Sequence, residues 1–232
     1  ASLDSVKKFA DRFLEKFDRL DILLNNAGIM MSPNFATADG FEGQTGINHL
    51  GHFALTGRLL EVIHSTENSR VVNVSSLAHK RGDGDFSRMV YSREGKYSST
   101  LAYGRSKLAN LLFTYELDRF FKQHHSASLA VAAHPGITKT SLSRYIEKNI
   151  TVKLVIPLFR LWAMSPEQGA LPQIRAAVDP GVNGGEYFGP GGRREYKGFP
   201  VQVPSNSLSH SEALASKLWT RSEELTGVNF RI

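Results

Sequence analysis

The sequence predicts an α/β protein with a parallel sheet that is covered by helices on both faces. Amphipathic helical patterns alternate along the chain with short apolar runs that are typical of buried strands. These runs end at polar or glycine-containing turns, and strands buried on both faces carry continuous apolar runs of this kind. We see neither an internal repeat nor a linker, so we expect residues 1–232 to form a single domain.

The first elements follow from their periodicity. A helix is predicted by the spacing of its apolar residues, Val6, Phe9, Ala10, Phe13 and Phe17. Ser2 or Asp4 would cap its N-terminus. The run 21–25 predicts a buried strand, a second helix is expected from about residue 39 to 63, and residues 70–75 predict another strand.

The second half of the chain continues the alternation. We expect a polar excursion over 80–99, a helix over 101–125, a strand over 129–133, a short strand over 186–188 and a last helix over 211–227. Another helix should begin near Ser165, because Ser165, Pro166 and Gln168 stand at the N-cap, N1 and N3 positions of a capping box.

Composition excludes several classes of protein. With 41% hydrophobic and 22% charged residues the chain is neither collagen-like nor disordered, and without cysteine it has no disulfide framework. The net charge of +6 is spread along the chain, which argues against a nucleic-acid groove. The absence of cysteine is compatible with a reducing compartment, and we expect a cytoplasmic protein.

No segment has the pattern of a signal peptide or of a membrane span. The opening stretch after Ala1 has neither a basic n-region nor an apolar h-region. The longest apolar stretch, 150–164, is interrupted by Lys153, Pro157 and Arg160, and it is shorter than the roughly 20 apolar residues that a spanning helix needs. It fits a surface-lying or lid segment better, and the basic residues around it permit peripheral membrane contact.

The pattern Tyr103-Gly-Arg-Ser-Lys107 carries the clearest chemistry. A spacing of four places the phenol and the ammonium group on one face of a helix. A cation held near a phenol lowers the pKa of the phenol from about 10 toward the range of a general acid or base. Taken alone the motif is weak, because an exposed Tyr/Lys pair on a solvated helix face has the same spacing.

Two further features point to the same edge of the sheet. Ser75 and Ser76 follow a predicted strand, and open α/β sheets present their ligand sites at the carboxyl ends of strands. A serine in that place is more often only an N-cap or a turn residue. Asn48 lies inside a predicted helix with Gly46 and Gly51 on either side, which suggests a bent or closely packed helix.

Together these motifs resemble the classical short-chain dehydrogenase/reductase family over nearly the whole chain. The motifs that carry the resemblance are, in order, Asn25-Asn-Ala-Gly28, Asn48, Ser75-Ser76, Tyr103-x-x-x-Lys107 and Pro135-Gly136. Within this family the sequence most resembles the retinol-dehydrogenase-related branch. The segments that carry this similarity are Asn48-His-Leu-Gly-His-Phe53, Val72-Asn-Val-Ser-Ser-Leu-Ala-His79 and Ser106-Lys-Leu-Ala-Asn110. The resemblance implies a Rossmann-type doubly wound parallel sheet.

The resemblance also implies a role for each catalytic residue. Tyr103 would be the proton donor for carbonyl reduction or the base for alcohol oxidation, and Ser76 would polarise the substrate oxygen. Lys107 would bind the nicotinamide ribose and lower the pKa of Tyr103, while Asn48 would hold a water that links Lys107 to solvent.

The same resemblance implies a nicotinamide cofactor, NAD or NADP, whose reactive chemistry the protein orients. Tyr103 and Lys107 would contact it together with two further groups: Asn26, Ala27 and Gly28 beside the adenosine portion, and Pro135, Gly136, Ile137 and Thr140 around the carboxamide.

The family's phosphate-binding motif, Thr-Gly-x-x-x-Gly-x-Gly, does not occur in the sequence. In the family the Asn-Asn-Ala-Gly turn ends the fourth strand, whereas here it ends the first predicted strand. We therefore expect the chain to be a fragment that lacks N-terminal strands, roughly 60 to 70 residues at about 30 residues per βαβ unit. An apolar sheet edge beside residues 22–24 should then be exposed.

Two other hypotheses concern ligands. His49 and His52 lie three residues apart, but no further ligand stands at a matching position, so packing is the better interpretation and we expect no metal. The apolar residues of an excursion at about 141–164 match the place of the family's substrate segment, which favours an apolar carbonyl or alcohol as substrate.

Two function classes follow. The first is an NAD(P)-dependent oxidoreductase that interconverts a carbonyl and an alcohol, and the complete set Asn48, Ser76, Tyr103 and Lys107 favours it. The second is a non-catalytic binding or interaction protein on a truncated scaffold, which the missing glycine motif favours. The sequence leaves open the choice of cofactor, the reaction direction and the formation of a homo-oligomer.

Overall fold

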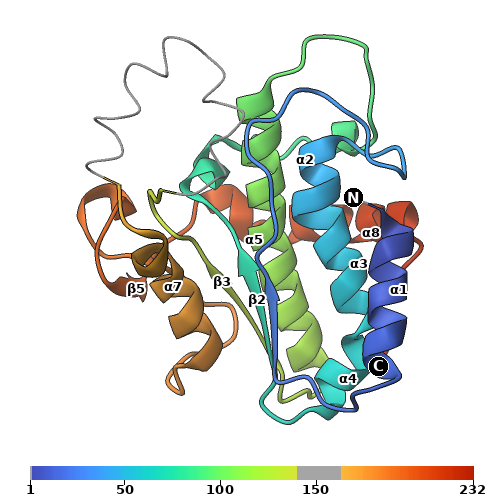
Figure 1. The fold of residues 1–232 in the computed structure, drawn as a ribbon, viewed down its shortest axis with the longest axis vertical. Coiled ribbons are helices and arrows are strands. Elements are labelled where there is room, and N and C mark those ends of the chain that lie inside the picture. The colour runs from blue at the N-terminus through green and yellow to red at the C-terminus, as the bar shows by residue number, and fades with distance from the viewer. Residues whose placement is uncertain (1, 140–162) are drawn as a thin grey trace.

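The structure, a computed structural model, describes residues 2–139 and 163–232. Within these residues one sheet has the strand order β1-β2-β3-β4-β5 (Figure 1). Its strands are β1 (Ile22–Asn25), β2 (Arg70–Val74), β3 (Leu129–Ala133), β4 (Tyr187–Pro190) and β5 (Pro200–Gln202). The first four strands are parallel, and β5 runs antiparallel to β4. The predicted α/β class with a parallel sheet is therefore confirmed, whereas β5 was not predicted.

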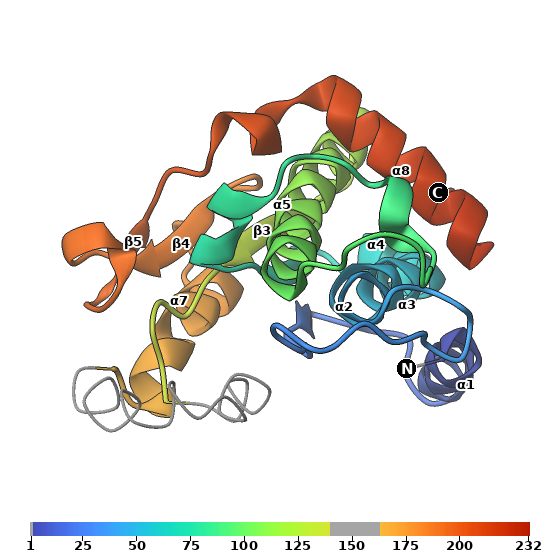
Figure 2. The ribbon, with the colours of Figure 1, turned by 90° about the horizontal axis from the view of Figure 1, so that it is seen from above.

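Helices precede, connect and follow these strands. Their bounds are α1 Leu3–Leu14, α2 Gly43–Thr45, α3 Gly51–Arg58, α4 Leu60–Ser65, α5 Ser99–Gln123, α7 Pro166–Val178 and α8 Glu212–Thr226. The capping box predicted at Ser165 is present at the start of α7, with reciprocal bonds between Ser165 and Gln168. Figure 2 shows α7 on one side of the sheet and α5 on the other.

The alternation of side chains along the central strands explains why both faces are covered. Val71 and Ala130 pack in one apolar cluster with Phe113 of α5. Their neighbours Val72 and Val131 belong to a different cluster, which includes Ala176 of α7. Because successive residues of a strand point to opposite faces, the continuous apolar runs supply both cores.

The helix predicted from about residue 39 to 63 begins later, at Gly43, and is not continuous. The structure divides this stretch into α2, a π-helical segment Gly46–Leu50, α3 and α4, with a break at Leu59, whose φ is −100°. The buried Glu42 carboxylate begins the series by accepting hydrogen bonds from Gln44 N (2.9 Å) and Thr45 N (2.8 Å). The irregularity at Asn48 agrees with the bend expected from its flanking glycines.

The C-terminal helix α8 lies along α5 and covers its outer face (Figure 2). It ends at Gly227, whose φ of 66° is the left-handed conformation that often terminates helices. The chain after it returns to the core, where the Phe230 ring packs 4.8 Å from that of Phe53 and 4.5 Å from that of Trp219. These contacts fix α3, α5 and α8 as one body behind the sheet.

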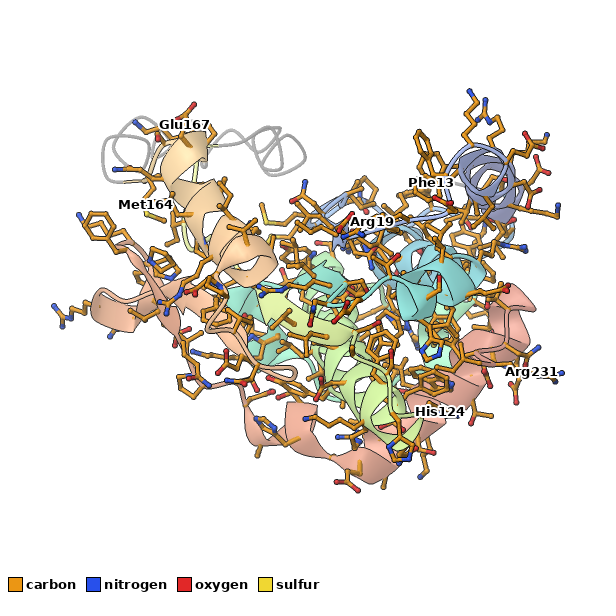
Figure 3. The ribbon with its side chains drawn as sticks, turned by 90° about the horizontal axis from the view of Figure 1, so that it is seen from below. Phe13, Arg19, His124, Met164, Glu167 and Arg231 are labelled. Atoms are coloured by element: carbon orange, nitrogen blue, oxygen red, sulfur yellow. The ribbon has the colours of Figure 1, made fainter. Side chains whose placement is uncertain are left out.

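At the β1 side of the described sheet, Ile22 is 40% and Leu24 is 44% exposed. The apolar edge predicted there is present. In Figure 3, Phe13 of α1 lies on this side of the molecule, and Met164 and Glu167 lie on the α7 side.

No helix in the described ranges is long and apolar enough to cross a membrane. Thr140 and the apolar segment expected at about 141–164 lie almost wholly outside the described residues, which resume at residue 163. Met164 is inside them, and it pairs with Thr138 in a short parallel bridge.

Candidate functional site

The four residues expected to be catalytic come from three neighbouring elements. Tyr103 and Lys107 lie one turn apart on α5, Ser76 follows the carboxyl end of β2, and Asn48 lies in the π-helical segment. Shared hydrogen bonds connect them: Lys107 contacts the end of β2, and Asn48 contacts the helical turn that carries Tyr103 and Lys107. The structure therefore brings the set together at the sheet edge where open α/β proteins bind ligands.

Lys107 is held at the end of β2. The residue is 4% exposed, and its ammonium group donates to the Val74 carbonyl oxygen at 2.8 Å. Asn110, one turn further along α5, donates to the same oxygen at 3.0 Å. Burial lowers the pKa of Lys107 to about 8. Asn110 was not singled out in the sequence, although its place three residues after Lys107 puts it on the same helix face.

The environment of Tyr103 corrects the expectation drawn from its spacing to Lys107. The Lys107 ammonium nitrogen lies 5.9 Å from the centre of the Tyr103 ring and donates to Val74 O. Burial raises the pKa of Tyr103, and the Ser76 side chain partly opposes this shift. Desolvation of the phenolate therefore outweighs any effect of the nearby cation, and the phenol is protonated at neutral pH.

The two adjacent serines differ in what their hydroxyls do. The Ser75 hydroxyl is buried and donates to the Lys107 carbonyl oxygen at 2.8 Å, so it fixes α5 against β2. Ser76 is half-buried, and its side chain interacts with Tyr103. It also accepts a bond from Ala78 N at 3.2 Å and so caps the short helix Leu77–Arg81. The capping role and the place beside Tyr103 are thus compatible.

Asn48 is locked in place by its side chain. The amide group donates to Ile29 O (2.9 Å) and to the Ser106 hydroxyl (2.9 Å), and the amide oxygen accepts from Ile29 N (2.8 Å). Ser106 in turn donates to the Tyr103 carbonyl oxygen. Asn48 therefore ties the chain that follows β1 to the turn of α5 that carries Tyr103, and π-helical turns are frequent at functional sites.

The turn after β1 supplies the space beside Lys107. Asn26 and Ala27 are exposed, and Gly28 is half-buried. A methyl group at Gly28 would lie 3.0 Å from Asn48 Oδ1 and 3.7 Å from the Lys107 ammonium nitrogen. An ammonium group has three N–H donors and Val74 takes one of them, so this side-chain-free position suits the hydroxyls of a ribose.

Gly104, inside the Tyr-x-x-x-Lys pattern, was missed as a functional position. A methyl group there would lie 3.0 Å from Ala78 O and from Gly82 N. Only a residue without a side chain lets the segment after Ser76 lie directly on α5. The close approach places Ser76 beside Tyr103, and no local sequence pattern signals it.

The expected carboxamide-binding turn lies at the end of β3. Pro135, Gly136 and Ile137 are half-buried, and Gly136 has a φ of 65°. Ile137 N donates to Tyr196 O at 2.9 Å, and Ile137 O accepts from Met164 N at 3.0 Å. Both polar groups of the Ile137 backbone are thus already bonded within the chain, and a ligand there would use the second lone pair of the carbonyl or replace Tyr196.

The two histidines of the π-helical region are buried. His49 bonds to the Ser222 hydroxyl at 2.9 Å and packs against Phe53 and Phe113. Burial lowers the pKa of His49 to about 3 and that of His52 to about 4. In the part of the chain that the structure describes, no three His, Cys, Asp or Glu side chains gather closely enough to hold a metal ion.

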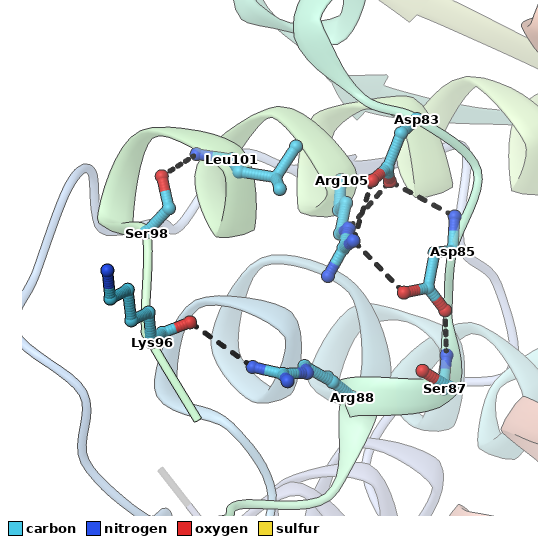
Figure 4. Close-up of polar contacts among 8 residues, drawn as sticks. All are labelled: Asp83, Asp85, Ser87, Arg88, Lys96, Ser98, Leu101 and Arg105. Carbon is cyan, nitrogen blue, oxygen red and sulfur yellow. Dashed lines mark hydrogen bonds and ion pairs between the residues drawn. The ribbon is translucent and has the colours of Figure 1, made fainter. Parts of the chain in front are cut away.

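A separate cavity of about 260 Å³ lies on the other face of α5, beside Leu101 and Arg105. The Arg105 guanidinium donates to the Asp83 carboxylate at 2.6 Å and to the Asp85 carboxylate at 3.0 Å, and Figure 4 shows how these side chains lie. These ion pairs hold the excursion after Gly82 against α5. Since residues 101 and 105 face away from residues 103 and 107 on a helix, the cavity does not open onto the Tyr103 site.

Comparison with known proteins shows which protein family the chain resembles. The family model for short chain dehydrogenase matches residues 1–151. Human retinol dehydrogenase 14 is 42% identical over 98% of this chain and 65% of its own length, and human retinol dehydrogenase 13 is 38% identical over 98% and 67%. The chain thus spans about two thirds of the length of these curated relatives.

The crystal structure of an uncharacterised protein from Mycobacterium paratuberculosis superposes with a TM-score of 0.79 at 38% identity, over 100% of this chain and 74% of that chain. The parallel sheet flanked by helices is the Rossmann-type architecture of this class of proteins. The chain is a member of the short-chain dehydrogenase family, in the branch related to the retinol dehydrogenases. This confirms the resemblance seen in the sequence.

Proposed function

We propose that the protein is an NAD(P)-dependent oxidoreductase that interconverts a carbonyl and an alcohol on a small apolar substrate. The observation that carries the proposal is the convergence of Tyr103, Lys107, Ser76 and Asn48 at the carboxyl end of β2. The names of the curated relatives, retinol dehydrogenases 13 and 14, favour a retinoid or a similar apolar alcohol as substrate.

When bound, the nicotinamide supplies or accepts the hydride at the substrate carbon. In the direction of reduction, the Tyr103 hydroxyl transfers its proton to the substrate oxygen as that oxygen gains negative charge. Burial raises the pKa of Tyr103, so the phenol is protonated at neutral pH and ready for this step. Alcohol oxidation needs the phenolate instead, so we expect it to become faster as the pH rises.

Ser76 and Lys107 support this proton transfer from two sides. The half-buried Ser76 hydroxyl next to Tyr103 would donate a hydrogen bond to the substrate oxygen and polarise the carbonyl. Lys107 would bind the nicotinamide ribose beside Gly28, through the N–H donors that Val74 does not take. Asn48 would hold a water that links Lys107 to solvent, so that a proton can return to Tyr103 after the transfer.

The test is an assay of the full-length protein, as its own cell produces it, with retinaldehyde and either NADH or NADPH. We expect substrate-dependent oxidation of one reduced cofactor and saturable binding of that cofactor by fluorescence titration. Saturable binding without turnover of retinaldehyde or of other apolar aldehydes would favour the alternative of a non-catalytic binding protein. The absence of both would remove the proposal.

A further inference from the structure

A cluster of charged and buried polar side chains lies beside the candidate site, and none of its members has a role in the function proposed above. Its centre is Glu195, in the short helix Arg193–Glu195 that follows β4. One carboxylate oxygen of Glu195 contacts His134 Nε2 at 3.1 Å, and the other accepts from the Lys80 ammonium at 2.8 Å. His134 directly follows β3, and Lys80 lies in the helix after Ser76. Glu195 therefore links two segments beside the site, which we call the His134 arm and the Lys80 arm.

The His134 arm reaches the Pro135–Gly136–Ile137 turn. His134 Nδ1 accepts from Gly136 N at 3.2 Å, which assigns the ring proton to Nε2 and directs it at Glu195. Burial lowers the pKa of His134, in agreement with a neutral ring. The residue after Glu195 adds a second bond, because Tyr196 O accepts from Ile137 N at 2.9 Å. The turn is therefore held from both ends by the segment that carries Glu195.

The Lys80 arm reaches Ser76. The carbonyl oxygen of Ser76 accepts from His79 N at 3.0 Å and faces His79 Nδ1 at 2.6 Å. The other ring nitrogen of His79 accepts from Asn206 N at 3.3 Å, so Nδ1 carries the proton and donates to Ser76. Lys80 follows directly and is tied to Glu195. A shift of Glu195 would therefore displace the short helix that Ser76 caps.

The backbone around Glu195 has an unfavourable conformation where this contact with Lys80 and His134 forms. Arg194 and Glu195 have φ values of 57° and 58°, in the left-handed region that residues with side chains seldom adopt. At Gly189 on β4 a methyl group would lie only 2.0 Å from His134 Nε2. Strain of this kind persists only where surrounding contacts over-determine it, and it gathers at functional sites.

We infer that Glu195 is a positioning residue that holds Ser76 and the Pro135–Gly136–Ile137 turn at a fixed separation through Lys80 and His134. The inference rests on the proposed function for its kinetic consequence, since the two arms would carry the group that polarises the substrate oxygen and the turn beside the nicotinamide. Glu195 touches neither reacting group in this arrangement. It acts on the reaction only through the placement of the two arms.

The kinetic test is Glu195→Gln in the full-length protein. This change keeps the size of the side chain. It removes the negative charge of the carboxylate that pairs with Lys80 and accepts the hydrogen bond from His134. We expect kcat/KM for the carbonyl substrate to fall about 10-fold, as loss of a charge-assisted hydrogen bond predicts. We also expect the KM of the cofactor to rise and the fold to be retained. Glu195→Asp, which keeps the charge, should recover part of the loss.

Glu116→Gln is the matched control. Glu116 pairs with Arg119 on α5 at a similar exposure, 26% against 17% for Glu195, but it lies away from the site. If the unmodified protein turns over the substrate, equal kinetics of Glu195→Gln and Glu116→Gln, or a lower KM of the cofactor in Glu195→Gln, would show that the positioning role is wrong.

A second readout does not depend on turnover. Amide hydrogen exchange at Ile137 should become faster in Glu195→Gln than in the unmodified protein, because its bond to Tyr196 O depends on the anchored segment. Unchanged exchange at Ile137 would overturn the inference even if the protein is an active oxidoreductase. Faster exchange in a protein without any turnover would support it while the proposed function fails.

Discussion

The two sides of the candidate site are built in different ways. On the α5 side, Tyr103, Lys107 and Asn48 are buried, and the side chains of Lys107 and Asn48 bond mainly to backbone groups. On the β3–β4 side, half-buried loops are joined by side-chain charges and by residues in left-handed conformations, with Glu195 at their centre. The first side fixes the groups that would move a proton, and the second fixes the loops around them.

This difference predicts that substitutions on the α5 side change turnover and unfolding free energy more than substitutions on the β3–β4 side. The largest effect is expected for Tyr103→Phe, which keeps the buried ring but removes the hydroxyl. Because general acid–base catalysis contributes about 10²- to 10⁴-fold, we expect kcat to fall about 10³-fold, with little change in the unfolding free energy. Steady-state turnover and urea unfolding would measure the two quantities.

Tyr115→Phe is the control for this change, since Tyr115 is buried on the same helix and bonds to the Ser205 hydroxyl at 2.8 Å. It should leave kcat nearly unchanged. Equal kcat in Tyr103→Phe and the unmodified protein would remove Tyr103 from the mechanism and weaken the contrast between the two sides.

Asn48→Ala should have the next largest effect, on stability rather than only on rate. It removes the bonds to Ile29 N and O and to Ser106, and it leaves buried backbone groups without partners. The cost should be about 3 kcal/mol of unfolding free energy, since each unsatisfied buried group costs roughly 1–3 kcal/mol. Urea unfolding at neutral pH measures it.

Asn34→Ala provides the comparison for this value. Asn34 donates to Ser92 O at 2.8 Å in an exposed loop, and its removal should cost less than about 1 kcal/mol. A loss for Asn48→Ala that is no larger than this would mean that the π-helical segment reorganises freely, contrary to the rigidity assigned to the α5 side.

The same difference explains what the sequence could predict. Tyr103 and Lys107 are one helical turn apart, so their common face follows from spacing alone. The strands β2 and β3 follow from apolar runs that need no partner to be recognised. What depends on local periodicity was therefore predicted within a few residues.

Contacts between distant segments could not be predicted in this way. Glu195 meets His134 across 61 residues, and nothing near Glu195 in the sequence marks it. Gly104 is needed because the segment after Ser76 crosses α5, which is a property of the folded chain. The pKa of Tyr103 also departs from the expectation, because burial outweighs the nearby cation. Depth of burial cannot be read from a spacing of four.

A third prediction uses pH to examine the buried α5 side. His49 has a pKa lowered to about 3 by burial, from an ordinary value of 6.5. Between these values the unfolded chain binds a proton that the folded protein does not, so stability falls as the pH falls below about 6.5. The limiting slope is about 1.4 kcal/mol per pH unit, which gives about 2 kcal/mol between pH 6.5 and 5.

His49→Gln removes this titration and should flatten the pH dependence of the unfolding free energy by that amount. Urea unfolding at a series of pH values compares His49→Gln with the unmodified protein. A slope for His49→Gln as steep as that of the unmodified protein would show that His49 is not held neutral in the fold.

The smallest effect is expected on the β3–β4 side, for Lys80→Met. The Lys80 side chain is 46% exposed, and ion pairs at such exposure contribute about 0–1 kcal/mol, so the unfolding free energy should fall by less than about 1 kcal/mol. Lys7→Met, in an exposed pair with Asp11 on α1, should cost about the same. The two variants should differ in turnover, because only Lys80 anchors Ser76 to Glu195. A stability loss for Lys80→Met as large as that for Asn48→Ala would mean that both sides of the site are equally rigid, and the charged contacts would then support the fold rather than adjust the site.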